Sequence, residues 1–553
     1  MANKWHFSVM EFPLDYNIVR YFFEAVRKYP GRIAVADKQT SIAFGTLAQQ
    51  VTDTARQLQA CGIGPGDRVL VFVPISIDLY RIVLAIFRCG AVAVFAEEWA
   101  NRHKLSEYLA IANCKAIIST RKILFLASLL NQTIRQIPVK INSRTCKRYY
   151  FPVKARFWRS EKYYFSAEQA YESWQATPDD EALVTFTTGS TGLPKAANRT
   201  HGFLRQQLNA LLPCIYSEQA AIDTLITTDS ERDMTLLPIV LLINLAIGRT
   251  SVLAAFNPRK PQTFQAREVI GQLQQHRVTS ITASPYYVEQ LAQCLLPGQA
   301  ASLNIQKIFC GGAAIFPDVA RKITQAFPQT AVHLVYGSTE AEPVARITAN
   351  ELLQQHPGLL LDRGLCVGYP ETSIEVAIIT RHISLTAHPT RVDFKNACCQ
   401  HDQLGEICVR GPHVLQHYLN HAQVFGDNKY VIDNATIWHR TGDAGYLDAK
   451  GYLYLAGRCR ELIDWQGNTY SPMVFENNVR QWLPNSQGTI LGIAGQPCII
   501  ISGTTDPQQA TQMLQEKFQP ASQWPIHFVR QIPRDKRHFS KIDYEALRTS
   551  IRK

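Results

Sequence analysis

The sequence has no Cys-X-X-Cys pair and no apolar run of membrane length. Its 13 cysteines are scattered over 553 residues, which argues against a disulfide scaffold and a zinc site of paired cysteines. The longest apolar run, at residues 236–248, is shorter than the roughly 20 residues that a membrane span needs. The first residues, MANKWHFSVMEF, contain no apolar signal-peptide core. We therefore expect a cytoplasmic protein with reduced thiols and without a membrane span.

Acidic residues are too few to balance the basic ones. The 57 Lys and Arg exceed the 45 Asp and Glu, so the net charge is +12. Such an excess of positive charge favours binding to a nucleic acid, an anionic membrane surface or an anionic substrate. The one basic cluster, at residues 143–162, is either solvated surface or a docking patch for an acidic carrier protein or a phosphorylated cofactor. Because no aromatic-basic module accompanies it, we predict no nucleic-acid partner.

A phosphate loop of the kinase and ATPase type is also missing. That loop needs the pattern G-x-x-x-x-G-K-[ST], whereas Gly189 to Lys195 reads GSTGLPK. The stretch nevertheless follows an apolar strand, and its glycines allow backbone N–H groups to point together at an anion. Further donors surround the glycines: Thr187, Thr188, Ser190 and Thr191, beside Gly192. The stretch is suited to cradle phosphate oxygens, although a purely structural Gly/Ser/Thr turn between strands has the same composition.

Helix-like and strand-like segments alternate along most of the chain. Apolar residues recur at helical spacing in residues 17–28, 46–62, 78–90, 104–113, 266–276, 286–296 and 318–327. Short β-branched runs occur at residues 68–74, 91–96, 115–120, 183–186, 278–284, 306–312 and 331–337. Strands interleaved with helices favour parallel sheets that helices cover on both faces. We therefore predict an α/β fold with a large N-terminal domain of parallel sheets and helices.

The pattern changes towards the end of the chain. Short β segments with polar turns predict a β-rich subdomain over about residues 402–457, the last part of an N-terminal domain that spans residues 1–457. The remaining residues, 458–553, are expected to form a small α+β C-terminal domain. The strands and helix predicted there are 488–495, 498–503 and 507–518.

A second polar stretch, YGSTEAEPVA at residues 336–345, again follows an apolar strand. Glu340 offers the oxygen ligand that Mg²⁺ prefers. Thr339 can donate a hydrogen bond to a phosphate, and Tyr336 offers a flat face to a purine ring. The alternative is a capped turn in which Glu340 starts a helix.

Two further stretches carry isolated charged residues. In RTGDAGYLDAKGYLYLAGRCRE, at residues 440–461, Asp443 is suited to accept two vicinal ribose hydroxyls and Arg458 to bridge to ribose or phosphate. An Asx turn between two β segments is the alternative for this T-G-D sequence. Near the end, PRDKRHFSKIDY contains Lys541, which by itself is typical of a solvated basic tail.

These four stretches, in this order and at these separations, resemble the motifs of the adenylate-forming superfamily of acyl-CoA synthetases, nonribosomal-peptide adenylation domains and luciferases. The resemblance runs from about residue 17 to the C-terminus and includes FCGGAAI at residues 309–315 and LGEICVRGP at residues 404–412. It implies that a carboxylate attacks the α-phosphorus of Mg-ATP, giving acyl-AMP and pyrophosphate. A nucleophile, commonly a thiol, then displaces AMP. Chemistry of this kind depends on positioning and charge neutralisation.

The resemblance implies roles for the nucleotide-binding residues. The β- and γ-phosphates would be held by Thr187, Thr188, Gly189, Ser190, Thr191, Gly192 and Lys195. The adenine side of the site would comprise Gly311, Gly312, Ala313, Tyr336 and Gly337. Asp443 would accept the ribose hydroxyls with help from Arg458.

The resemblance also implies the catalytic groups. Thr339 would contact the α-phosphate, and Glu340 would hold Mg²⁺. Lys541 would reach the carboxylate and α-phosphate oxygens in the first step only. A mobile C-terminal domain would then rotate about a hinge near Arg460 and withdraw this lysine.

The chain departs from the family pattern at its predicted acyl pocket and hinge. The segment LPIVLLINLAIG, at residues 237–248, is apolar, and Leu241 lies near the position where many thioester-forming members have a His. With Leu237 and Asn244 it forms a predicted wall that suits an acyl chain better than an amino acid. In the hinge, Arg460 replaces the usual Lys, and Val474 replaces an acid in PMVFE.

Short segments are also similar to a branch that includes the β-lactone synthetases of olefin biosynthesis, in which the substrate's own β-hydroxyl displaces AMP. They are RDKRHFSKI, LPIVLLINLAIG and YGSTEAEPVA. The sequence thus predicts a ligase that uses ATP and Mg²⁺ to activate an apolar carboxylic acid. Transfer to CoA or an acyl carrier protein is the default, and lactone closure is the alternative.

A rival of another class is a non-catalytic nucleotide-binding scaffold, which the altered hinge makes conceivable. Against it stands the joint presence of the charged residues that the chemistry needs: Lys195, Glu340, Asp443, Arg458 and Lys541. A scaffold has no use for phosphate-, metal- and carboxylate-binding groups together.

Overall fold

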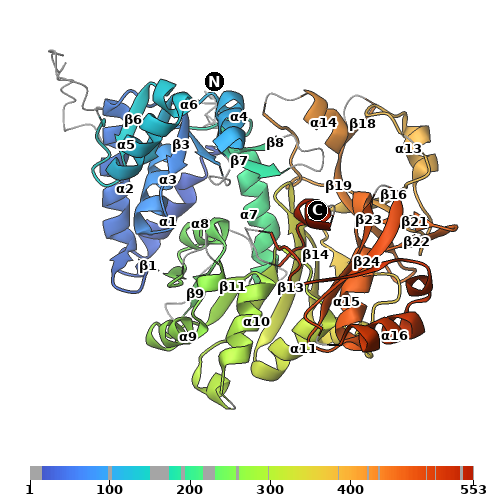
Figure 1. The fold of residues 1–553 in the computed structure, drawn as a ribbon. Helices are drawn as coiled ribbons and strands as arrows, with labels where there is room; N and C mark the ends of the chain where they lie inside the picture. Colours follow the sequence, from blue (N-terminus) through green and yellow to red (C-terminus); the bar gives the residue numbers. More distant parts are fainter. Residues whose placement is uncertain are drawn as a thin grey trace, which may run out of the picture.

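The computed structural model shows a large body to which a smaller C-terminal unit is attached (Figure 1). It describes residues 15–96, 102–149, 173–188, 194–215, 231–256, 261–296, 298–383, 385–419, 422–433, 436–493, 495–504, 506–535 and 540–551. Over these residues, no helix combines the length and the apolar character that a membrane crossing needs.

The N-terminal part of the large body contains a six-stranded sheet over the described residues, in the order β6-β5-β3-β4-β7-β8. Its strands are β3 (Arg68–Phe72), β4 (Val92–Phe95), β5 (Ala116–Ser119), β6 (Val139–Asn142), β7 (Glu181–Thr188) and β8 (Pro194–Thr200). The helices of this part are α2 (Phe44–Ala60), α3 (Ile77–Arg88), α4 (Arg102–Ala112), α5 (Arg121–Leu130) and α6 (Gln132–Gln136). The pairs from β6 to β7 are parallel, and β7 and β8 form an antiparallel hairpin. Strands β3, β4 and β5 are buried almost throughout, as parallel strands covered on both faces are.

A second sheet, with 14 strands in the described part of the chain, forms the rest of the large body. Its parallel half contains β1 (Ile33–Ala36), β9 (Arg232–Thr235), β10 (Thr250–Leu253), β11 (Ser280–Ala283), β12 (Lys307–Gly311) and β13 (Ala331–Ser338), with β2 (Ser41–Ala43) at the edge. The helices here are α1 (Val19–Lys28), α7 (His201–Ile215), α8 (Pro238–Ala246), α9 (Ala266–Gln275), α10 (Pro285–Cys294) and α11 (Pro317–Ala326). The carboxyl ends of β12 and β13 lie side by side, because Gly311 pairs with Val335. In open α/β sheets, such strand ends are where ligands bind.

The other half of this sheet is antiparallel. Its strands are β14 (Ala341–Thr348), β15 (Leu365–Pro370), β16 (Glu375–Thr380), β17 (Gly405–Arg410), β18 (Lys429–Ile432), β19 (Thr436–Leu447) and β20 (Leu453–Arg458). Three short helices accompany them: α12 (Ala349–Gln355), α13 (Arg391–Ala397) and α14 (Ala422–Asn428). The β-rich subdomain expected at about residues 402–457 thus shares one sheet with β15 and β16, which precede it in the chain.

The C-terminal unit follows β20, which ends at Arg458, and the domain boundary between residues 457 and 458 stays a prediction. The unit consists of β21 (Ile463–Trp465), β22 (Asn468–Tyr470), α15 (Pro472–Trp482), β23 (Gln487–Ile493), β24 (Gln496–Ser502), α16 (Pro507–Lys517), β25 (Ile526–Val529) and α17 (Tyr544–Ile551). Its own core packs β23 and β24 against α15 and α16, with Trp524 buried between them. The predicted fold class is therefore confirmed: a large α/β domain with parallel sheets and a β-rich part, followed by a small α+β unit.

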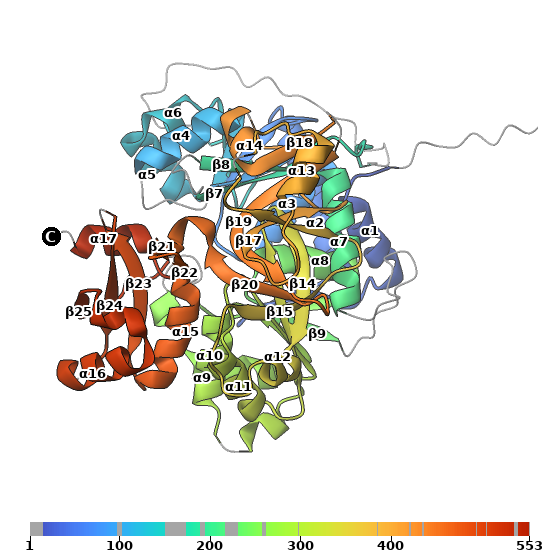
Figure 2. The ribbon, with the colours of Figure 1, turned by 90° about the vertical axis from the view of Figure 1, so that its right-hand side faces the viewer.

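Helix α15 joins the C-terminal unit to the large body (Figure 2). Ser471 caps this helix by accepting a hydrogen bond from Val474 N and also donates one to the carbonyl oxygen of Ala456. Further along, the side-chain amide of Asn478 exchanges two 2.7 Å hydrogen bonds with the backbone N–H and carbonyl of Leu361. Asn477 donates to the carbonyl oxygen of Leu359 at 2.8 Å. Two neighbouring asparagines thus hold the unit against a backbone segment of the large body.

Replacing Asn478 with Ala should weaken this attachment. The substitution leaves a buried N–H and a buried carbonyl of Leu361 without their partner, and each such group costs about 1–3 kcal/mol. We expect the free energy of unfolding, measured with urea, to fall by about 2–6 kcal/mol, the sum for the two groups. The exposed Gln515→Ala on α16 should change it by less than about 0.5 kcal/mol. An unchanged midpoint and slope in the Asn478 variant would show that the two bonds do not hold the unit.

Candidate active site

The first polar stretch of the sequence folds as the hairpin of β7 and β8. Thr187 pairs with Lys195, and Thr188 pairs with Pro194, in antiparallel register. The other predicted phosphate-binding residues lie outside the described residues: Gly189, Ser190, Thr191 and Gly192. The pairing places Lys195 near the start of β8, directly opposite Thr187 at the end of β7.

Lys195 lies among charged groups from separate parts of the chain. Its Nζ donates a hydrogen bond to Oδ1 of Asn428. Burial lowers the pKa of Lys195, the charge of Glu340 opposes this shift, and the charges of Arg458 and Arg460 add to it. The fold thus gathers the lysine of the first stretch, the acid of the second and the arginines of the third within electrostatic range of one another.

Thr339 and Glu340 occupy the tight connection between β13 and β14. The following residue already belongs to a strand, so Glu340 does not start a helix. Arg199 of β8 donates a 3.1 Å hydrogen bond to the carbonyl oxygen of Thr339. The Glu340 side chain is largely buried, and its Oε1 accepts a hydrogen bond from the hydroxyl of Tyr418 at 3.4 Å. Two contacts therefore hold the acid at the carboxyl end of β13: Arg199 of β8 binds the preceding carbonyl, and Tyr418, from the segment after β17, binds the carboxylate.

Asp443 and Arg458 face each other across the β19–β20 pair. Arg458 Nε lies 3.2 Å from Asp443 Oδ1, and Tyr336 donates its hydroxyl to Asp443 Oδ2 at 2.8 Å. Arg458 also donates to the carbonyl oxygen of Thr441 at 3.0 Å. The charge of Asp443 raises the pKa of Arg458, and burial together with Asp443 raises the pKa of Tyr336. The structure therefore brings Tyr336, Asp443 and Arg458 into one contact group.

The predicted adenine segment lies beside this group. Gly311 ends β12, and a Cβ on it would lie 3.1 Å from the carbonyl oxygen of Val335 on the neighbouring β13. Gly312 has φ +85°, a left-handed conformation that favours glycine, and Ala313 follows it. Gly337 is similarly confined, because its Cβ would lie 2.9 Å from the carbonyl oxygen of Ala341. The backbone of this region is thus closely packed at the ends of two parallel strands.

The predicted hinge is a short turn after β20. Arg460 lies 56% exposed with its Nε 3.1 Å from Glu461 Oε1. The Glu461 side chain is buried, and Arg548 of the last helix binds its other oxygen. Two arginines, one in the hinge and one in α17, therefore share a single buried carboxylate.

Lys541 belongs to a loop that Asp535 closes. Asp535 Oδ1 accepts the backbone N–H groups of Ser540 at 3.0 Å and Lys541 at 2.7 Å, and the N–H of Asp535 donates to the carbonyl oxygen of Lys541 at 2.8 Å. The Lys541 side chain is exposed. In α10 of the large body, burial raises the pKa of Tyr287 to about 12, with smaller contributions from Tyr286 and from the charge of Asp535. The loop of Lys541 therefore lies within electrostatic range of α10.

Helix α8 carries the predicted acyl-pocket residues. Leu241 is fully buried in the core, and Asn244 donates hydrogen bonds of 3.0 Å to Asp233 Oδ2 and to Ser251 Oγ. Leu237 is the N-cap residue of the helix. Leu241 and Asn244 therefore lie in the core between α8 and the large sheet. Other residues of the same helix line a cavity.

That cavity has a volume of about 50 Å³ and lies between helices α1, α3, α7 and α8. It is lined by Ile18, Phe22, Leu84, Phe87, Leu204, Gln207, Leu208, Ile239, Leu242, Ile243 and Ala246. Apart from Gln207 these walls are apolar, which suits an apolar ligand better than a polar one. Leu208 and Ile243 also belong to the apolar cluster of Phe309, which precedes Gly311 by two residues in β12. The cavity is therefore packed against the strand that leads to the adenine segment.

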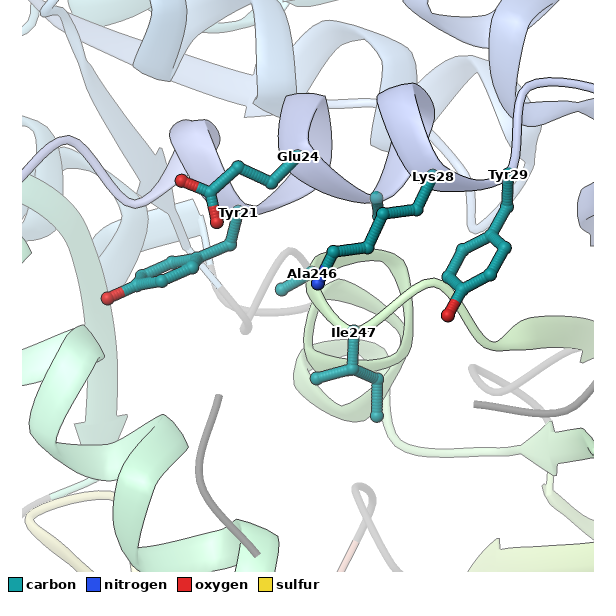
Figure 3. Close-up of a pocket in the computed structure, with 7 residues that line it drawn as sticks. Tyr21, Glu24, Lys28, Tyr29, Ala246 and Ile247 are labelled. Atoms are coloured by element: carbon teal, nitrogen blue, oxygen red, sulfur yellow. The ribbon is translucent and has the colours of Figure 1, made fainter. Parts of the chain in front are cut away.

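A second, smaller hollow lies where α1 crosses the end of α8 (Figure 3). Lys28, at the end of α1, extends towards Ala246, Tyr29 follows it beside the end of α8, and the Tyr21 ring points away from them. Its volume of about 10 Å³ is close to the minimum that a single water needs. It is therefore too small to hold a substrate group.

The donor set at Glu340 fits Mg²⁺ bound together with a nucleotide. In the part of the chain that the structure describes, no three His, Cys, Asp and Glu side chains are grouped so as to hold a metal. Proteins usually bind Mg²⁺ through one or two carboxylates, while substrate phosphates and waters supply the other ligands. A single buried carboxylate near two or more cations is consistent with a metal that arrives with an anionic substrate.

Several residues that no motif marks also contribute to the site. Asn428 holds Lys195, and its carbonyl oxygen lies 3.2 Å from Nδ1 of the buried His439. Lys429 is completely buried, which lowers its pKa to about 7; the charge of Glu340 opposes this shift and that of Lys195 adds to it. The sequence offers one signal for Lys429, a charge at the start of the apolar run KYVI. For the others the signal is absent, because polar residues in a long connection look like ordinary loop residues.

Comparisons with known proteins show which family and fold this chain resembles. The family model described as AMP-binding enzyme matches residues 22–419. The olefin β-lactone synthetase of Xanthomonas campestris is 27% identical, over 96% of this chain and 96% of its own length. The 4-coumarate–CoA ligase of Humulus lupulus is 23% identical over 83% of this chain and 78% of its own. The structure of O-succinylbenzoate CoA synthetase from Bacillus subtilis with ATP and magnesium has a TM-score of 0.71 at 20% identity, covering 95% of this chain and 98% of that one.

The family model spans well over half of the chain and includes Lys195 and Glu340, whereas Asp443, Arg458 and Lys541 lie beyond its end. The full-length similarity to a β-lactone synthetase confirms the resemblance to that branch. The chain therefore belongs to the AMP-binding enzyme family, as an adenylate-forming acid ligase related to the acyl-CoA synthetases and the β-lactone synthetases.

Proposed function

We propose that this ligase joins an apolar carboxylic acid to AMP, with release of pyrophosphate from ATP. The observation that carries the proposal is the convergence of Lys195, Glu340 and Arg458, whose charges act on one another although they come from three separate stretches. A triphosphate needs cations around it, and these residues supply two of them. Asp443, next to Arg458, offers acceptor oxygens for the ribose hydroxyls.

Each group then has a distinct task in the first step. Lys195 neutralises the pyrophosphate that leaves, and the side chain of Thr339 donates to the α-phosphate. Glu340 would hold Mg²⁺, which supplies charge neutralisation to the phosphates when it is bound. Lys541 stabilises the charge that develops as the substrate carboxylate oxygen bonds to the α-phosphorus and the bond to the pyrophosphate oxygen breaks.

The acyl tail is proposed to enter the cavity between α1, α3, α7 and α8. The apolar lining suits a hydrocarbon chain. In this proposal the side of α8 that carries Leu242 and Ile243 contacts the acyl tail. The buried Leu241 and Asn244 anchor the helix in the core on its other side. An amino-acid substrate is disfavoured, because its ammonium would meet no carboxylate on this lining.

For the second step we favour closure by the substrate's own β-hydroxyl. The hydroxyl oxygen bonds to the acyl carbon, the bond from that carbon to the AMP oxygen breaks, and the hydroxyl proton passes to solvent. The supporting observation is the similarity to a β-lactone synthetase along almost the whole of both chains. Transfer to the thiol of CoA or of an acyl carrier protein is the second candidate, supported by the similarity to CoA ligases.

Pyrophosphate release with a panel of carboxylic acids tests the first step. We expect release with apolar acids of medium and long chain and little with amino acids, because the proposed tail site is apolar. AMP release from a β-hydroxy acid without a thiol would support lactone closure, and a requirement for CoA would support thioester formation. No pyrophosphate with any acid would overturn the enzymatic proposal.

Filling the cavity should change the preferred chain length. Leu242→Phe adds bulk to the lining, so we expect the ratio of kcat/KM for long acids to that for short acids to fall about tenfold, which corresponds to about 1.4 kcal/mol. Val240→Phe, on the same helix but outside the lining, serves as the matched control and should leave the ratio near its original value. Equal losses for all chain lengths would place the tail elsewhere.

Replacing Lys541 with Ala should separate the two half-reactions. Adenylation should fall by at least about 100-fold, as expected when a charge-stabilising group is removed. ATP affinity, measured by calorimetry, and conversion of a supplied acyl-AMP should change little, because in our proposal this lysine serves the first step alone. Loss of both half-reactions in a folded variant would contradict a lysine that acts in one orientation of the C-terminal unit.

A further inference from the structure

Residues 414–419 form a segment that connects the two catalytic hairpins, and it is hereafter named the strut. One end pairs with the metal-site hairpin, where Val414 bridges to Ala341 and the backbone N–H of Leu415 donates to the carbonyl oxygen of Glu340 at 2.7 Å. The other end pairs with the phosphate hairpin, where the N–H of Leu419 donates to the carbonyl oxygen of Ala196 at 2.9 Å. The strut therefore fixes the distance between Glu340 and β8, the strand that carries Lys195.

The buried side chain of Lys429 contacts the strut. Its side chain has no exposed surface, its Nζ donates a hydrogen bond to the carbonyl oxygen of Leu415, and the ammonium lies 5.5 Å from the ring centre of Tyr418. Tyr418 in turn donates its hydroxyl to Glu340. One lysine thus contacts the strut at Leu415, which binds the backbone of Glu340, and at Tyr418, which binds its side chain.

Stability alone does not account for a lysine in this position. Removing an ammonium from water is costly, and replacing buried charged groups with apolar ones of similar size is often neutral or stabilising. The neighbouring residue performs a parallel task, because Asn428 binds the ammonium of Lys195 directly. Two consecutive residues at the junction of α14 and β18 therefore support the two opposite charges of the site.

We propose that Lys429 is a positioning residue that, through the strut, holds the Glu340 carboxylate in the orientation that receives the metal of the metal–nucleotide complex. This inference rests on the proposed function, since it assigns the task of Glu340 from it. It extends that function to a residue outside every motif. It also assigns the two neighbouring residues to different hairpins: Lys429 orients Glu340, and Asn428 binds Lys195.

The test is Lys429→Met, with calorimetric ATP titrations in excess Mg²⁺ and in excess EDTA. We expect the Kd of Mg-ATP to rise about tenfold, while the Kd of metal-free ATP changes less than about twofold, because Asn428 still holds Lys195. The midpoint of thermal unfolding should stay the same or rise, as it does when a buried charge is replaced by a well-packed apolar chain. The exposed Lys450→Met is the matched control and should behave like the unmodified protein.

Tyr418→Phe supplies an independent measurement, because it removes the hydroxyl contact to Glu340 and keeps the ring. If both residues act through the same carboxylate, the double variant should lose less Mg-ATP affinity than the sum of the single losses. Tighter Mg-ATP binding by Lys429→Met would overturn the proposal, since it would show that the lysine merely repels the metal. Equal weakening with and without metal would also overturn it, and so would a large fall in the unfolding midpoint with unchanged affinities. If the unmodified protein binds no Mg-ATP, the proposed function fails together with this inference; if it binds Mg-ATP and Lys429→Met is silent, the inference alone fails.

Discussion

The pairing of Asp443 with Arg458 is the interaction on which the site depends. It joins the interior of β19 to the end of β20, binds the hydroxyl of Tyr336, and places a cation within range of Lys195 and Glu340. Arg458 is also the last residue of β20, so the chain leaves the site directly into the hinge turn. The residues proposed to contact the nucleotide and the start of the C-terminal unit are therefore covalently adjacent. In the proposed function, a change in the orientation of that unit would act on the ribose and phosphate contacts directly.

Much of the fold could be predicted from the sequence, because its elements have clear periodicity and strong boundaries. The helix predicted at residues 78–90 is α3, which Ser76 caps and whose successor Cys89 begins the turn into β4. The strands predicted at residues 306–312 and 331–337 are β12 and β13. The acid at Glu340 was predicted at a strand end, which is where the structure has it, and Thr187 and Thr188, the described residues at the start of the phosphate stretch, end β7. Here local preference and tertiary packing agree.

The rest depended on contacts between distant residues. The sequence predicted an apolar wall at residues 237–248, but neither that it forms helix α8 nor which side of the helix faces a cavity. All sides of α8 are apolar except at Asn244, and that residue binds Asp233 and Ser251. Lys429 lies 89 residues after Glu340 in the chain (429 − 340 = 89) and reaches it only through the strut. Strands β15 and β16 also pair with partners far along the chain. Such pairings are set by the packing of the whole sheet and leave no local signature.

The attachment of the C-terminal unit has a consequence for how the protein can evolve. Asn477 and Asn478 bind the main chain at residues 359 and 361 and not its side chains. Side chains in that segment can drift without loss of docking, provided that the backbone keeps its course. The two asparagines are harder to replace, because these hydrogen bonds need a side-chain amide. Among the other residues only Gln has one, and its side chain is longer. Among relatives, the asymmetry should be visible as variability on one side of the interface and constancy on the other.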